Sequence, residues 1–211
     1  MRPVTRDSLP HLVAVARDGL RQRRDTLAAR LLARWWGIEL EDGVRFLGLP
    51  LLRRLPGTRI RIGAGSEFRS ARWSNQVGLD RPCMLSTLAP GAEISIGRGV
   101  GMSGTVLGAA LRISIGDGVL CGANCTITDT DWHAIDAADR AAEVPARAAA
   151  VVIEPGVWLS MNVTVLKGVT IGAGTVVAAG SVVSRSLPGG VIAAGSPAAP
   201  VRDIRPLRRL A

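Results

Sequence analysis

Apolar residues recur every six positions in the C-terminal half of the chain. The phased positions from residue 151 onward are Ile153, Leu159, Val165, Ile171, Val177 and Val183. A small or β-branched residue stands two places before each, and a glycine or asparagine recurs between the pairs, at Gly156, Asn162, Gly168, Gly174 and Gly180. Paired inward residues separated by corner residues indicate short strands broken by tight turns. The pattern predicts an all-β solenoid in which three strands close one coil.

The same pattern is visible, with less regularity, earlier in the chain. Ile115, Cys121 and Ile127 keep the period of six, whereas the pairs Ile94–Ile96 and Ile60–Ile62 are spaced irregularly. We therefore expect the solenoid over residues 58–190. Ordinary hairpins would not hold a constant six-residue period. The 25 glycines, 12 prolines and 3% aromatic content also fit a frequently turning chain with a core of small residues.

Residues 8–36 have helical spacing instead. Leucines, valines and alanines recur at three and four positions, Ser8 suits an N-cap and Gly37 a C-terminal stop, while Gly19 could split the helix in two. We expect residues 1–57 to be a helical segment that caps the open edge of the solenoid, and residues 191–211 to be a C-terminal tail. The alternative is a helix lying on a membrane surface, because arginines and Trp35–Trp36 suit an interface.

The net charge of +9 is concentrated at the two ends of the chain. Residues 1–57 hold 11 arginines against 6 acids, and residues 199–211 hold 4 arginines against Asp203. Basic residues are not interleaved with aromatic ones and no recognition motif is visible, so we expect no nucleic-acid partner. The three cysteines, with no apolar leader, predict reduced thiols and a cytoplasmic protein, with Cys121 and Cys125 as core residues.

Repetition stops after Ile127 and resumes at Val151, so residues 128–150 are expected to project from the solenoid. His133 lies in this loop, near Asp129, Asp131 and Asp136. A projecting loop on a rigid repeat commonly carries function, and a carboxylate near an imidazole fixes its tautomer and raises its basicity. We interpret His133 as a general base, against the alternative of a solvated loop histidine. One loop histidine with scattered aspartates does not form a tetrahedral set, so no metal is expected.

Trp158 is expected to point outward, because its neighbours Val157 and Leu159 are inward by phase. An exposed tryptophan on the flat side of a solenoid requires cover. It could pack against a neighbouring subunit or form a wall for a ligand beside His133. Both interpretations of Trp158 hold if the site lies between subunits.

The sequence resembles the hexapeptide-repeat acyltransferases, and more nearly the maltose and galactoside O-acetyltransferase group and its relatives in polysaccharide biosynthesis. The resemblance spans about residues 94–203. It is carried by residues 115–129, by Asp131-Trp-His-Ala-Ile-Asp, by Val157-Trp, by residues 169–183 and by Ala194-Gly-Ser-Pro-Ala. It implies a left-handed parallel β-helix, a homotrimer, acetyl-CoA in the groove between two subunits, and His133 as general base.

Further roles follow from the same resemblance. The acceptor is expected to contact Asn124, Asp131 and Trp132. The residues expected to hold acetyl-CoA are Trp158, Ser160, Met161, Ala179, Gly180, Ser184, Arg185 and Arg202, with a backbone N–H at the Ser160–Met161 turn facing the oxyanion. The chain departs from the family in having Ser160 in place of glycine and Ala199 in place of a basic residue, for which Arg202 or Arg205 could substitute.

We therefore expect an acetyl-CoA-dependent O-acyltransferase that acts on a sugar or glycan-precursor hydroxyl by direct transfer. An amino-sugar nitrogen or a natural-product hydroxyl would use the same base. The alternative from another class is a non-catalytic β-helix that serves as a scaffold or binding protein. The Arg-rich helix adds the hypothesis of peripheral contact with the inner face of a membrane.

Overall fold

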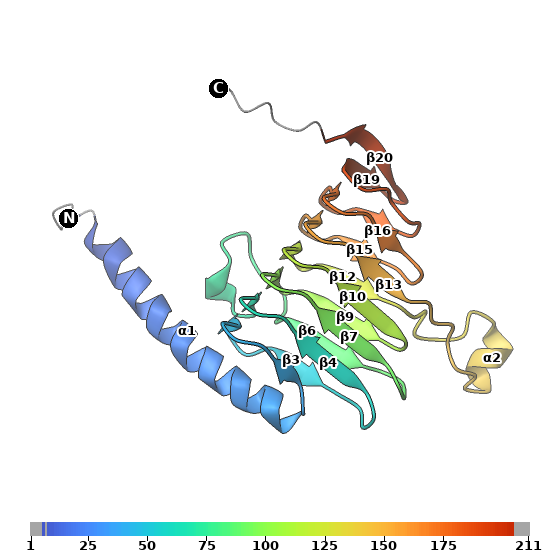
Figure 1. Ribbon diagram of the computed structural model, residues 1–211, viewed down its shortest axis with the longest axis horizontal. Coiled ribbons are helices and arrows are strands. Elements are labelled where there is room, and N and C mark those ends of the chain that lie inside the picture. Colours follow the sequence, from blue (N-terminus) through green and yellow to red (C-terminus); the bar gives the residue numbers. More distant parts are fainter. Residues whose placement is uncertain (1–5, 7, 205–211) are drawn as a thin grey trace.

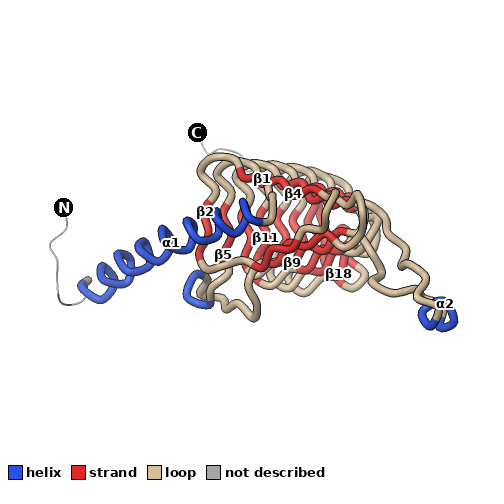
Figure 2. Tube along the Cα trace, turned by 90° about the horizontal axis from the view of Figure 1, so that it is seen from below, coloured by secondary structure: helices blue, strands red, loops and turns tan. Residues whose placement is uncertain are grey.

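Three β-sheets, which we call A, B and C, form the body of the molecule, and all their strands pair in parallel except the last strand of sheet B (Figures 1 and 2). The computed structural model describes residue 6 and residues 8–204. Along most of this chain each strand pairs with the third strand after it, so that the chain passes through sheets A, B and C in turn. The coils therefore stack, as the six-residue period predicts.

Each sheet takes its strands from successive coils. Sheet A contains β1 (Glu39–Leu40), β4 (Arg59–Ile62), β7 (Glu93–Ile96), β10 (Arg112–Ile115), β13 (Val151–Ile153) and β16 (Thr170–Ile171). Sheet B contains β2 (Arg45–Leu47), β5 (Glu67–Arg69), β8 (Gly101–Ser103), β11 (Leu120–Ala123), β14 (Trp158–Leu159), β17 (Val176–Val177), β19 (Val191–Gly195) and β20 (Ala198–Asp203). Sheet C contains β3 (Leu51–Arg53), β6 (Met84–Thr87), β9 (Val106–Ala109), β12 (Thr126–Thr128), β15 (Thr164–Val165) and β18 (Val182–Val183).

Inward side chains of the same phase lie on one another from coil to coil. In sheet A, Ile62 is in register with Ile96, which is followed by Ile115, Ile153 and Ile171. The six phased positions predicted from the sequence are at most 1% exposed. Asn162 adopts a φ of 58° at its corner, where Gly180 in the next coil adopts 71°, so asparagine takes the place of glycine as predicted. The predicted core and corner positions are confirmed.

The first coil begins at Glu39, about twenty residues before the expected boundary at residue 58. Strands β1, β2 and β3 pair in parallel with β4, β5 and β6, so residues 39–53 belong to the coils and not to a separate capping segment. Leu40, Phe46 and Leu52 are six residues apart, so this coil keeps the period with a large core residue, Phe46, whose ring stacks on Phe68 with centroids 5.2 Å apart. At the other end, β19 continues sheet B and β20 pairs with it antiparallel, so residues 191–203 of the expected tail belong to sheet B.

The loop at residues 128–150 is not the single interruption of the coils. Residues 70–83, between β5 and β6, form a second excursion that contains the 3₁₀-helix η1 (Arg72–Ser74). Irregular spacing in the early coils concealed this second loop from sequence analysis. Arg81 anchors it, donating to the carbonyl oxygens of Gly104 and Asn124 at 3.3 and 2.9 Å.

The helix α1 (Leu9–Trp35) is continuous through Gly19 and ends where Gly37 adopts a φ of 62°. Its buried residues are Asp25, Ala29 and Ala33, which recur every four positions and face the first coil. The leucines with helical spacing lie on the opposite side: Leu20, Leu27 and Leu31 are 62–68% exposed. The large apolar residues with helical spacing therefore do not form the packed face, because small residues make the contact with the coil.

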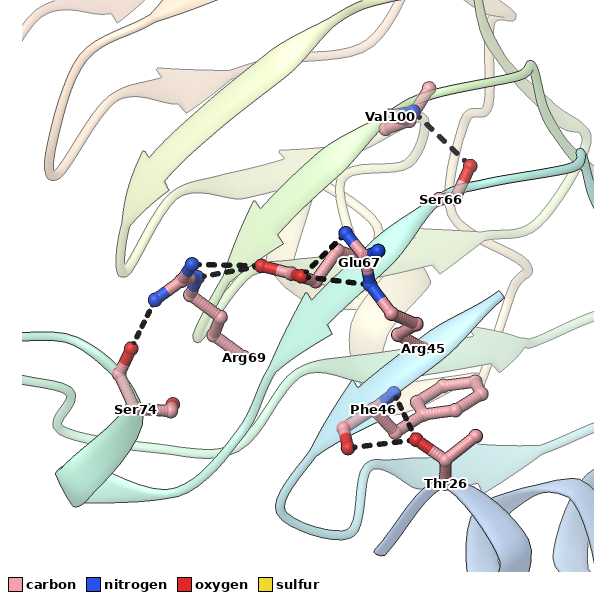
Figure 3. A network of polar contacts seen from close by, with 8 residues as sticks. All are labelled: Thr26, Arg45, Phe46, Ser66, Glu67, Arg69, Ser74 and Val100. Atoms are coloured by element: carbon pink, nitrogen blue, oxygen red, sulfur yellow. Dashed lines mark hydrogen bonds and ion pairs between the residues drawn. The ribbon is translucent and has the colours of Figure 1, made fainter. Parts of the chain in front are cut away.

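Polar groups of α1 bind the edge of the first coil (Figure 3). The hydroxyl of Thr26 accepts from Phe46 N–H at 3.0 Å and donates to Phe46 C=O at 3.2 Å. The carboxylate of the buried Asp25 accepts from Gly48 N–H at 2.9 Å. Phe46 lies in β2, the first strand of sheet B, whose outer edge has no further strand within the described chain. The helix thus covers this edge of the first coil. No helix of the described chain is long and apolar enough to cross a membrane.

We predict that Thr26→Val lowers the free energy of unfolding by about 1–3 kcal/mol, because the N–H and C=O of Phe46 both lose their partner at a partly buried edge. Thr26→Ser keeps the hydroxyl and serves as the matched control. Denaturant unfolding of the three proteins measures the difference. Equal stability of the valine and serine variants would show that the hydroxyl contributes nothing to the cap.

Candidate active site

The loop at residues 128–150 projects from the corner between sheets C and A, and hydrogen bonds hold its first residues to the coil. The buried carboxylate of Asp129 accepts from the N–H groups of Ala110, Leu111 and Arg112 at 2.7, 2.8 and 2.6 Å. Thr130 forms an antiparallel bridge with Ala148. Asp129 therefore holds the loop to the neighbouring coil, and its carboxylate does not orient His133.

Beyond this base the loop contains the short helix α2 (Ala137–Ala141). Asp136 caps it, its side chain accepting from the N–H groups of Ala138 and Asp139 at 2.8 and 3.2 Å. Of the three aspartates near His133 in the sequence, two are thus committed to backbone N–H groups.

His133 is exposed and forms no hydrogen bond within residues 8–204. Asp131 lies closer to the coil: its Oδ1 is 2.6 Å from the ammonium of Lys167, while its Oδ2 is buried without a hydrogen-bond partner in the described chain. An unpaired buried carboxylate oxygen is costly and is a common feature of functional sites. Lys167 therefore holds Asp131 through one carboxylate oxygen only, at the start of the loop that carries His133.

Sequence reasoning missed Lys167. It occupies the corner between β15 and β16, directly after the coil that follows the loop, and it is the one lysine among 26 basic residues. That rarity was the available signal. Its pairing with Asp131 could not be predicted, because 36 residues separate the two and the insertion hides their register.

Trp132 lies with its ring against Gly108 of β9. A Cβ added at Gly108 would be 2.9 Å from Cζ2 of the indole, so the close approach requires glycine. The backbone of Trp132 has a φ of 65°, and its N–H donates to Thr130 Oγ1 at 3.3 Å. This conformation places Trp132 at one end of a cleft on the outer face of sheet C.

Asn124 lies at the corner between sheets B and C, with a φ of 62°. Its side chain binds the second excursion: Oδ1 accepts from Asp80 N–H at 3.0 Å and Nδ2 donates to Asp80 Oδ2 at 3.1 Å. The structure therefore gives Asn124 a role in anchoring residues 70–83, and sheet C separates it from the loop that holds His133. Its predicted contact with the acceptor remains a prediction.

Five of the residues expected to hold acetyl-CoA lie together. Trp158 is half exposed on the outer face of sheet B, and the other four follow at the corner between sheets B and C: Ser160, Met161, Ala179 and Gly180. Gly180 N–H donates to Met161 C=O at 3.0 Å, so these corners are stacked directly. We call these five residues the B–C column.

The N–H of Met161 is the candidate oxyanion donor within the B–C column. Ser160 N–H already donates to Val177 C=O at 2.9 Å, whereas Met161 N–H has no acceptor within the described residues. Ser160 has a negative φ, so serine replaces the family's glycine there without strain.

The remaining cofactor candidates lie elsewhere. Ser184 and Arg185 are exposed at the corner between sheets C and A, and Arg202 is exposed in β20 opposite Ile192. Arg205 is outside the described residues. Within one chain, sheet C thus separates the B–C column from both the loop of His133 and Arg185.

The cysteines belong to the core. Burial raises the pKa of Cys125 to about 11 and raises the pKa of Cys121 and Cys83 above the ordinary thiol value. Such thiols are protonated at neutral pH and are poor nucleophiles. This confirms the prediction that Cys121 and Cys125 fill the core.

Comparisons with known proteins agree on the repeat and on the fold. The family model of the bacterial transferase hexapeptide (six repeats) matches residues 150–185. A hexapeptide-repeat-containing acetyltransferase of Vibrio cholerae, solved with acetyl coenzyme A, is similar with a TM-score of 0.56 and 23% identity over 92% of this chain and 87% of that one. The N-acyltransferase AntD of Bacillus cereus, solved with dTDP-4-amino-4,6-dideoxyglucose and coenzyme A, has a TM-score of 0.63 and 16% identity over 84% of this chain and 90% of that one. A search of curated protein sequences finds no match.

The predicted resemblance to hexapeptide-repeat acyltransferases is thereby confirmed. The chain carries the hexapeptide repeat of bacterial transferases and shares its fold with acyltransferases of that type.

Proposed function

We propose that this protein is an acyltransferase that uses acetyl-CoA as its co-substrate and His133 as general base. The observation that carries the proposal is an exposed imidazole without a structural partner, on a loop that a buried carboxylate holds to hexapeptide coils. Solved neighbours of the same fold contain acetyl-CoA or CoA, which supports the choice of co-substrate.

In the proposed reaction, His133 accepts the proton of the acceptor hydroxyl while the hydroxyl oxygen forms a bond to the thioester carbonyl carbon. The oxyanion receives a hydrogen bond from Met161 N–H. The intermediate then collapses with cleavage of the carbon–sulfur bond, and the imidazolium returns the proton to the CoA sulfur. Positioning of the two substrates and the oxyanion donor supply most of the rate enhancement.

We further propose a sugar or glycan-precursor hydroxyl as the acceptor. The amino-sugar ligand solved with AntD supports nitrogen as the second candidate, because the same base serves an amine. Release of CoA thiol, measured with matched hydroxyl and amino sugars, distinguishes the two. A non-catalytic scaffold would release no thiol above the uncatalysed rate with any acceptor.

The complete site is proposed to lie between two copies of the chain in a homotrimer of left-handed β-helices. One copy presents its His133 loop, and the neighbour presents its B–C column with the exposed Trp158. The separation of these two elements by sheet C within one chain supports this arrangement.

The outer face of α1 is proposed to contact an anionic membrane surface. It combines exposed leucines with Arg23 and Arg34, whereas the two acids of residues 8–36, Asp18 and Asp25, lie on or beside the inner face. The support for this contact is the attraction of the arginines to anionic lipid, beside the exposed leucines.

We predict that His133→Ala lowers kcat/KM by roughly 10²–10⁴-fold, as expected for loss of a general base. The fold should be unchanged, since His133 forms no hydrogen bond within the described residues. His11→Ala, which removes the second, exposed histidine, is the matched control and should keep full thiol release. Near-normal activity of a folded His133→Ala variant would disprove the assigned base.

Mixing two inactive variants tests the shared site. Trp158→Glu places a carboxylate where the anionic acyl-CoA is proposed to bind, and His133→Ala removes the base from the other half. If each site uses both halves from different copies, random mixed trimers at equal ratio should recover about a quarter of the activity. No recovery in trimers shown to be mixed would place the whole site within one chain.

Vesicle sedimentation tests the proposed membrane contact. The protein should sediment with vesicles that contain anionic lipid, less so at high salt, and Arg23→Glu with Arg34→Glu should abolish retention. Two charge reversals elsewhere, Arg98→Glu and Arg112→Glu, serve as the control. Equal loss in both pairs would reduce the effect to net charge and refute a role for the helix.

A further inference from the structure

A cleft of about 560 Å³ lies on the outer face of sheet C, between Trp36 after α1 and Trp132 of the His133 loop. Its floor consists of two rows of side chains from β3, β6 and β9. One row, Leu51, Met84 and Val106, is apolar. The cleft has the volume and the mostly apolar lining of a small-molecule site.

The second row explains why the face is hollow. Arg53, Ser86 and Gly108 are in register across the same strands, and the last two have small side chains or none. The bulky residues of the first row therefore stand beside a groove, which Trp132 bounds through its contact with Gly108.

The polar groups of the cleft are of two kinds. Arg54 and Thr87 are satisfied by the protein: Arg54 donates to Trp36 C=O and Thr58 C=O at 2.6 and 2.7 Å, and Thr87 Oγ1 lies 2.8 Å from Thr58 Oγ1. The guanidinium of Arg53 and the hydroxyl of Ser86 form no hydrogen bond or ion pair within the described residues. No aspartate or glutamate lines the cleft. It thus offers an unpaired cation and a hydroxyl within an apolar, aromatic surface.

We propose that this cleft binds an amphipathic anion: a molecule with an aromatic or aliphatic body, packed between Trp36 and Trp132, and a phosphate or carboxylate held by Arg53 and Ser86. Because Trp132 directly precedes His133, the bound molecule is the acyl acceptor. This last assignment rests on the proposed function, whereas binding itself does not. The acceptor class is thereby narrowed from any sugar to one attached to an apolar group, or to a compound of similar polarity.

Binding is measured by calorimetry with 1-naphthyl phosphate and n-octyl phosphate as aromatic and aliphatic probes, and with glucose 1-phosphate as a polar control. At least one apolar phosphate should bind at least about tenfold more tightly than glucose 1-phosphate, which carries the same anionic group. Equal affinity of all three would overturn the proposal, because the apolar body would then contribute nothing.

Three variants locate the site. Ser86→Trp fills the groove and should weaken binding of the apolar phosphates by at least about tenfold. The same substitution at Ser114, an outward position of sheet A, is the control and should have no effect. Arg53→Gln should remove most of the preference for naphthyl phosphate over neutral naphthol. Unchanged binding of the apolar phosphates in Ser86→Trp would overturn the proposal. Probe binding that rises when trimers dissociate would also overturn it, because a second copy would then occlude the cleft.

The two proposals can fail separately. His133 does not line the cleft, so His133→Ala should bind the probes normally. If His133→Ala loses acyl transfer while Ser86→Trp binds the probes as before, the proposed acyltransferase activity is supported and the proposed binding site in the cleft is overturned. If His133→Ala keeps acyl transfer while Ser86→Trp loses probe binding, the binding site in the cleft is supported and the assignment of His133 as general base is overturned.

Discussion

The structure depends on one geometric constraint: every inward side chain must fit on the side chain of the same phase in the preceding coil. In the inner row of sheet B, Phe46 is followed by Phe68, Met102, Cys121, Leu159, Val177 and Ala193. Close packing couples the size of each residue to that of its neighbours. The row changes from large rings in the first coils to small residues in the last. The irregular spacing of the early coils has another source, the excursion at residues 70–83 between β5 and β6.

A stack of parallel coils also leaves two open edges, and the chain closes them differently. At the start, one threonine hydroxyl satisfies both backbone groups of Phe46, and small residues of α1 allow the helix to approach. At the end, β20 turns back and pairs antiparallel with β19. Neither closure uses the corners or the outer faces of the sheets, so those surfaces remain available for ligands.

The coils from residue 94 onward and the projecting loop could be predicted from the sequence, because a fixed period leaves a direct trace in the residue order. The start at Glu39 was missed: Leu40, Phe46 and Leu52 keep the period, but three positions are too short a run to stand out, and Phe46 and Phe68 differ from the small core residues of the later coils. Proximity along the sequence was also misleading for the site. Asp129 and Asp136 flank His133 but bind backbone N–H groups, whereas the partner of Asp131 is a lysine 36 residues away. The partners of these side chains depend on which residues lie in register in neighbouring coils. An insertion makes that register impossible to read from the sequence.

Because the coils are rigid, the residues of the proposed site stay on separate corners of the solenoid. The corners of a three-sided stack face in different directions, and sheet C keeps the His133 loop away from the B–C column at every coil. Three hydrogen bonds to Asp129 fix the base of the loop at the corner between sheets C and A. Trp132 belongs both to the cleft and to the loop. In the proposed arrangement, one copy of the chain recognises the acceptor and accepts its proton, and the neighbouring copy binds the acyl donor. Changes in the cleft would then alter the acceptor without disturbing the surface proposed to hold the acyl donor.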